Sequence, residues 1–137
     1  MGVILNSKEE YSVSGESVNG ITEITIKGRA TRTNVDNIQQ DVFNMALQCR
    51  LLIIDVREIT GRLPISDSYI RVRNLRKLGR PINRFTAIID NPENYEFQKF
   101  YETTALNAGV QTKVFTDIEE GRAWLLGLLR LLSGSIN

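Results

Sequence analysis

The stretch LLIIDVREITGRLPISDSYIRVRNLRKLG, from Leu51 to Gly79, changes character twice along its length. It opens with an apolar run that is too short for a helix and is flanked by charged residues, which is typical of a central strand covered on both faces. After Asp55 it becomes a polar turn, and from about Ser66 to Leu78 it has helical spacing. A strand followed by a helix in this way indicates an α/β fold.

The segments before this stretch predict a hairpin and a helix. An Asn-Gly pair at Asn19 and Gly20 separates YSVSGESV from ITEITIKG, which both favour β-structure, and it supplies the positive φ angles of a tight turn. Apolar residues at helical spacing over residues 35–48 then predict an amphipathic helix with Asn34 as its N-cap.

The C-terminal half repeats the strand and helix pattern twice. RFTAIID and TKVF are the expected strands. A helix is expected over NPENYEFQKFYETTALNAG, with Asn91 as its cap and Phe100 on its apolar face, and a last helix is expected after Thr116 or Asp117. We therefore expect one α/β domain over residues 1–137, with a single mixed, mostly parallel sheet of five strands, an N-terminal hairpin and about four helices.

The composition limits the function classes. With 42% apolar residues, 24% charged residues and a formal net charge of +1, the chain is typical of a globular protein and gives no overall sign of nucleic-acid binding. It contains no histidine, which excludes Ser-His-Asp and Cys-His nucleophiles and the usual zinc ligand sets. Its one cysteine, Cys49, is expected to be a buried, inert thiol. No cofactor or metal is expected, and a cytoplasmic location is expected because the N-terminus lacks the features of a signal peptide.

Ligands of open α/β sheets gather beyond the carboxyl ends of the parallel strands. By this rule the candidate rim contains Arg29 and Arg32 after the second strand, Asp55 and Arg57 after the third, and Asp90 after the fourth. Arginines that bind an anion, with a carboxylate as base, would make the protein an anion-binding protein or an enzyme. Capping of the next turn or helix is the favoured role of the two carboxylates, and the chain contains no glycine-rich phosphate loop.

Cations dominate the expected second helix. Arg73, Arg76, Lys77 and Arg80 share one face at 100° per residue, whereas Arg71 projects on the apolar side. Two interpretations stay open for this face. It is either a solvated outer surface, or a docking patch for an acidic partner or for anionic lipid headgroups.

Apolar residues cover about half of the last helix. They are Trp124, Leu125, Leu128, Leu129, Leu131 and Leu132, and Leu126 widens the arc. Packing on one face of a sheet either buries them all or leaves some for a dimer, a partner or a membrane surface. The run is far too short to span a bilayer.

With these elements placed, the chain resembles the STAS domain, the fold of bacterial anti-sigma-factor antagonists, and especially the STAS-like branch compared with CRAL-TRIO lipid-binding domains. The resemblance rests on LLIIDVREITG, RFTAIIDNPENYEFQKFYETTALNAG and TKVFTDIEEGRAWLL. It implies regulation through a serine at the start of the second helix, which makes Ser66 and Ser68 candidate phosphorylation sites. Capping of that helix by Ser66 or Asp67 explains the same residues without a switch.

The leading hypothesis is a non-enzymatic, cytoplasmic STAS-like binding module. It acts through a protein partner or an apolar or lipid ligand, and a peripheral membrane contact and a homodimer are among the expected contacts. The expected contact residues are Arg57, Arg71, Arg73, Lys77, Trp124 and Leu128. The alternatives are an anion-binding protein or enzyme at the strand-end rim and a serine-phosphorylated switch.

Overall fold

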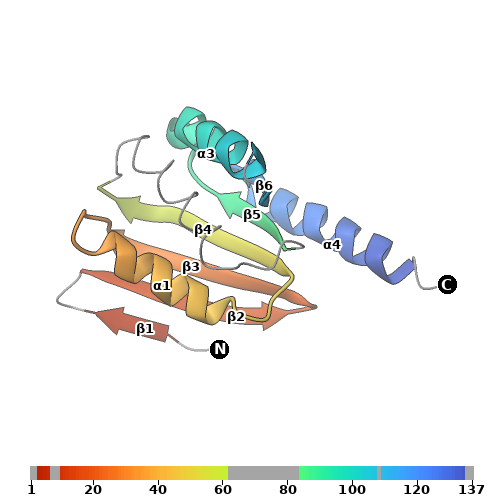
Figure 1. Cartoon of the computed structure of the whole chain (residues 1–137), viewed down its shortest axis with the longest axis horizontal. Coiled ribbons are helices and arrows are strands. Elements are labelled where there is room, and N and C mark those ends of the chain that lie inside the picture. Colours follow the sequence, from red (N-terminus) through yellow and green to blue (C-terminus); the bar gives the residue numbers. More distant parts are fainter. Residues whose placement is uncertain (1–2, 7–9, 62–83, 108, 135–137) are drawn as a thin grey trace.

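Figure 1 shows the computed structural model, which describes residues 3–6, 10–61, 84–107 and 109–134, with the backbone alone for residues 3–6. One sheet contains six strands in sequence order, from β1 at one edge to β6 at the other. The strands are β1 (Val3–Asn6), β2 (Tyr11–Val18), β3 (Ile21–Arg29), β4 (Leu51–Thr60), β5 (Phe85–Ile89) and β6 (Gln111–Phe115). Pairing is antiparallel from β1 to β3 and parallel from β3 to β6. The mixed, mostly parallel sheet and its five predicted strands are confirmed.

β1 is a strand that the sequence did not predict. It pairs antiparallel with β2, from Val3 opposite Ser14 to Asn6 opposite Tyr11. Its four residues, VILN, are too few to show the alternation that marks a strand. The pairing with β2, rather than a local pattern, therefore decides its conformation.

The tight turn between β2 and β3 is confirmed. Asn19 and Gly20 have φ angles of 55° and 83°, the left-handed values that a two-residue hairpin turn requires. The turn joins Val18 directly to its cross-strand partner Ile21. The register of the whole hairpin follows from this turn.

β4 continues five residues beyond Asp55, where the sequence predicted a turn. The pairing of β3 with β4 shifts by one residue, because Thr25 lies opposite Asp55 whereas Lys27 lies opposite Glu58. This is a β-bulge with its extra residue in β4, and bulges bend a strand and change the direction of its side chains. Asp55 therefore lies inside a strand, at the point where pairing with β5 ends.

Helices cover both faces of the sheet. They are α1 (Val35–Met45), the short 3-10 helix η1 (Pro92–Asn94), α3 (Tyr95–Asn107) and α4 (Ile118–Gly134). One buried cluster joins α1 and α3 to the face that contains Ile24, and a second joins α4 to the face that contains Ile53. α4 extends past the ends of the strands in Figure 1. The expected helix from about Ser66 to Leu78 lies outside the described residues.

Two asparagines occupy cap positions without using their side chains as caps. Asn34 precedes α1, but its Oδ1 accepts the N–H of Thr31 at 2.7 Å and its Nδ2 donates to the Arg29 carbonyl at 2.8 Å. Asn91 precedes η1, and its Nδ2 donates to the Arg57 carbonyl at 2.8 Å. The predicted positions are right, whereas the side chains join neighbouring loops and strands.

α3 is attached to the edge strand β6 by a polar contact. Glu102 Oε2 accepts the backbone N–H of Val114 at 2.8 Å, and Oε1 of the same carboxylate accepts from Lys99 Nζ at 2.8 Å. Phe100, which was expected on the apolar face, is 40% exposed. The buried face of α3 instead includes the polar Gln98, whose side chain is bonded to Asp90.

Candidate functional site

The residues that the sequence singled out fall in two regions. The strand-end rim consists of Arg29, Arg32, Asp55, Arg57 and Asp90. The second region is the outer side of α4, which contains Trp124 and Leu128. Arg71, Arg73, Lys77, Ser66 and Ser68 lie outside the described residues, so their roles stay predictions.

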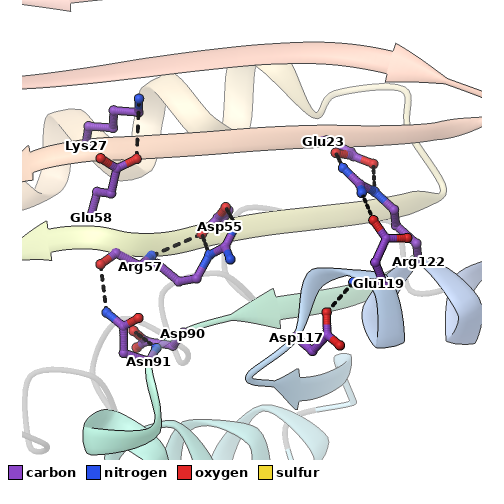
Figure 2. Close-up of polar contacts among 10 residues, drawn as sticks. All are labelled: Glu23, Lys27, Asp55, Arg57, Glu58, Asp90, Asn91, Asp117, Glu119 and Arg122. Carbon is purple, nitrogen blue, oxygen red and sulfur yellow. Dashed lines mark hydrogen bonds and ion pairs between the residues drawn. The ribbon is translucent and has the colours of Figure 1, made fainter.

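At the strand-end rim, Asp55 and Arg57 form a two-pronged ion pair. Arg57 Nε donates to Asp55 Oδ1 at 3.0 Å and Nη2 donates to Oδ2 at 2.7 Å (Figure 2). The backbone N–H of Arg57 also donates to Oδ1, at 3.1 Å, across the bulge of β4. These hydrogen bonds to Asp55 raise the pKa of the Arg57 guanidinium. Both carboxylate oxygens are therefore already engaged within the strand.

Asp90 follows β5 and is 1% exposed. Its Oδ1 accepts the backbone N–H of Asn91 at 2.7 Å and the side-chain amide of Asn94 at 3.1 Å. Its Oδ2 accepts from Gln98 Nε2 at 2.7 Å. Asp90 therefore does not cap a helix in the usual way, because two of its three donors are side-chain amides, and it holds the start of the η1 and α3 segment against the sheet.

The strand-end rim is poorly arranged for acid–base chemistry. A general base needs an oxygen that can reach substrate, but Asp90 is enclosed by three donors and Asp55 is held by Arg57. Arg29 ends β3 and Arg32 lies in the following turn, and both are exposed. Within the described ranges, no cluster of three or more His, Cys, Asp or Glu side chains could hold a metal ion.

α4 begins at a side-chain cap and lies close to β5. Asp117 Oδ1 accepts the N–H of Glu119 at 2.9 Å, which confirms Asp117 as the cap (Figure 2). Gly121 permits the close approach, because a Cβ there would lie 2.8 Å from Ile89. One turn later Leu125 is fully buried.

An ion pair joins α4 to β3. Arg122 Nε and Nη2 each donate to the Glu23 carboxylate at 2.7 Å, and Nη1 donates to Glu119. The hydrogen bonds to Glu23 are the main cause of the raised pKa of Arg122. Figure 2 shows Arg122 reaching from α4 across the sheet to Glu23.

Trp124 is the centre of a partly exposed surface, here named the aromatic ridge and defined as Phe85, Phe115, Trp124 and Leu128. Its ring centroid lies 6.4 Å from that of Phe85 and 5.8 Å from that of Phe115. Lys113 Nζ lies 5.6 Å from the Phe115 centroid and 6.0 Å from the Trp124 centroid. All four members of the ridge are partly exposed.

The sequence pointed to Trp124 and Leu128 but missed the rest of this surface. Phe85, Phe115 and Lys113 come from β5 and β6, so only the parallel pairing of those strands and the docking of α4 bring them to Trp124. Of the two alternatives left open for the leucines of α4, the structure supports incomplete burial, because Leu131 is 71% exposed. No helix within the described ranges is long and apolar enough to cross a membrane.

Cys49 is less buried than the sequence suggested. It is half-buried between α1 and β4, and burial raises the pKa of its thiol, although Arg84 and Thr22 act in the opposite direction. A raised pKa keeps the group as an unreactive thiol near neutral pH. Cys49 is therefore a poor candidate for a nucleophile.

Solved structures that share this architecture include two proteins. One is an anti-sigma factor antagonist from Mycobacterium paratuberculosis, with a TM-score of 0.62 at 9% sequence identity over 88% of this chain and 98% of that chain. The other is an uncharacterized protein of the DUF3478 family from Shewanella loihica PV-4 with a SpoIIAA-like fold, with a TM-score of 0.55 at 17% identity over 84% and 93% of the two chains.

Comparison with protein-family models and with curated proteins gives no match. The relation to CRAL-TRIO lipid-binding domains stays a prediction. Sheet order, helix placement and both structural matches agree on the architecture. The chain has a STAS-like fold, the fold of anti-sigma factor antagonists.

Proposed function

We propose that the protein is a non-enzymatic binding module that engages a protein partner through the aromatic ridge. The observation that carries this proposal is the partly exposed Trp124 between Phe85 and Phe115, with Lys113 beside it. Aromatic residues next to a cation are typical of the sites that dominate protein–protein binding energy. Lys113 favours a partner with a carboxylate near its apolar contact.

The fold and the strand-end rim support the same class of function. One structural neighbour is an anti-sigma factor antagonist, whose name describes an action on another protein. The rim supports catalysis less well, because Asp55 and Asp90 are engaged in hydrogen bonds that hold β4, η1 and α3 together. A binding surface on α4, away from that rim, is the simpler assignment.

The proposal is tested by photocrosslinking in the host cell. A benzophenone side chain at Leu128 should give a covalent adduct of one defined mass, because this position is part of the aromatic ridge. The matched control is Leu47, which is 53% exposed in the turn after α1, the helix that covers the opposite face of the sheet. Equal adducts at both positions, or none at Leu128, would overturn the assignment.

A second measurement distinguishes a protein from a lipid. Lys113→Glu reverses an exposed charge beside the ridge and should weaken the Leu128 adduct without lowering the melting temperature. If the ridge instead binds a membrane, anionic vesicles will retain the purified protein at low salt and release it at high salt. That result would replace the protein partner with a lipid surface.

A further inference from the structure

A second stripe of α4, separate from the aromatic ridge, faces solvent along most of the helix. This outer stripe consists of Glu120, Ala123, Gly127 and Arg130, and all four residues are exposed. Their spacing of three, four and three residues places them within an arc of about 80° on one side of the helix. The same spacing forms the contact seam between two packed helices.

The chemistry of the outer stripe changes along its length. Its middle consists of two small residues, Ala123 and Gly127, and a Cβ placed on Gly127 would meet nothing within 4 Å. Its ends carry opposite charges, and neither Glu120 nor Arg130 forms an ion pair with another residue in the described part of the chain. Glu119, one position earlier, is by contrast bonded to Arg122.

The order of these residues makes the outer stripe complementary to itself. Glu120 and Arg130 lie at equal distances in sequence on the two sides of Leu125, and so do Ala123 and Gly127. A second α4 that runs antiparallel, with a two-fold axis that passes between the two outer stripes at the level of Leu125, would place each Glu120 opposite an Arg130. It would also place each Ala123 opposite a Gly127, where small residues allow two helices to approach closely.

We propose that the outer stripe is the interface of a homodimer in which two copies of α4 pack antiparallel. A second copy fits better than a foreign partner because both charged ends are complemented by the same surface after a two-fold rotation. Leu131, 71% exposed beside the outer stripe, would then pack against the first turns of the second helix. This proposal does not rest on the partner that binds the aromatic ridge.

Charge reversal gives a direct test by sedimentation velocity at low salt and high micromolar concentration. The native protein should sediment as a dimer, and Glu120→Arg or Arg130→Glu alone should weaken dimerisation about tenfold or more by placing like charges opposite each other. An equimolar mixture of the two variants should form heterodimers, because each then supplies what the other lacks. Glu96→Arg, an exposed acid in the first turn of α3, is the matched control and should leave the dimer intact.

A second variant tests close packing without changing charge. Gly127→Gln removes a helix-interior glycine at an open position, so the melting temperature of the monomer should rise by a few degrees. The same side chain should obstruct the second helix and weaken dimerisation.

A native protein that sediments as a monomer would overturn the proposal, and so would single charge reversals and Gly127→Gln that leave the dimer unchanged. A Leu128 adduct that persists in Glu120→Arg would show that partner binding is a separate property.

Discussion

The strand-end rim and the exposed side of α4 differ in whether their side chains have partners within the protein. At the rim, the carboxylates of Asp55 and Asp90 are enclosed by donors from their own segments. On α4, Leu131 is 71% exposed, and Glu120 and Arg130 lie in solvent without ion pairs to other described residues. Groups that have satisfied one another stabilise a fold, whereas groups left without a partner are those that a second molecule can use.

Two leucine truncations compare the buried and exposed sides of α4 most directly. Leu125→Ala should lower the free energy of unfolding by about 3 kcal/mol, because this side chain is fully buried and its removal leaves a cavity. Leu131→Ala should change it by less than about 0.5 kcal/mol in the monomer. Urea unfolding of both variants measures the difference, and similar losses would contradict the orientation of α4.

The structural role of the rim is tested at Asp90. Asp90→Ala leaves the backbone N–H of Asn91 and the amides of Asn94 and Gln98 without their acceptor, which should cost about 2 kcal/mol of unfolding free energy. Glu93→Ala removes an exposed acid from the same turn and should have almost no effect. A destabilisation confined to Asp90→Ala would support a structural role for the Asp90 carboxylate. An Asp90→Ala variant as stable as the native protein would make the strand-end rim a candidate functional site again.

The ion pair that attaches α4 to β3 should contribute less to the free energy of unfolding than Leu125 or Asp90. Arg122→Ala removes a pair whose guanidinium side chain is 36% exposed, so after solvent screening the expected loss is about 1 kcal/mol. Lys27→Ala removes a pair in which both side chains are more than half exposed, and its effect should be below about 0.3 kcal/mol. A double-mutant cycle with Glu23→Gln measures the coupling, and a value near zero would contradict the attachment.

The smallest expected effect concerns pH and Cys49. Because burial raises the pKa of this thiol, alkylation in the folded protein should be slower at mildly alkaline pH than in the same chain unfolded in guanidinium. The folded state retains its proton above the ordinary thiol pKa, so stability should fall slightly as pH rises from that value toward the raised one. Equal alkylation rates in the two states would show that Cys49 is accessible.

Local signals in the sequence were enough for much of the fold. The turn at Asn19 and Gly20 was predictable because an Asn-Gly pair readily adopts left-handed φ angles. β4 and β5 were predictable because a short apolar run is typical of a strand that is buried on both faces. The extension of β4 to Thr60 was not predictable in this way, because its polar residues become a strand only by pairing with β3. β1 depends on β2 in the same manner.

The candidate site was predictable only in part, and for a related reason. The helical spacing of α4 placed Trp124 and Leu128 together, but Phe85 and Phe115 join them through strand order. The position of Asp90 after an apolar strand predicted a cap, whereas its carboxylate bonds mainly to side-chain amides. Its bond to Gln98, on the buried face of α3, depends on the packed structure.

The contact between Glu102 and the Val114 N–H has a consequence for aggregation. β6 lies at an edge of the sheet, and its sequence QTKVF favours strand addition by another chain. The carboxylate of Glu102 occupies a backbone donor that an incoming strand would need, and Lys113 adds an exposed charge. Growth of cross-β structure from this edge would require α3 to detach first, so the helix protects the folded protein against fibril formation as well as covering its core.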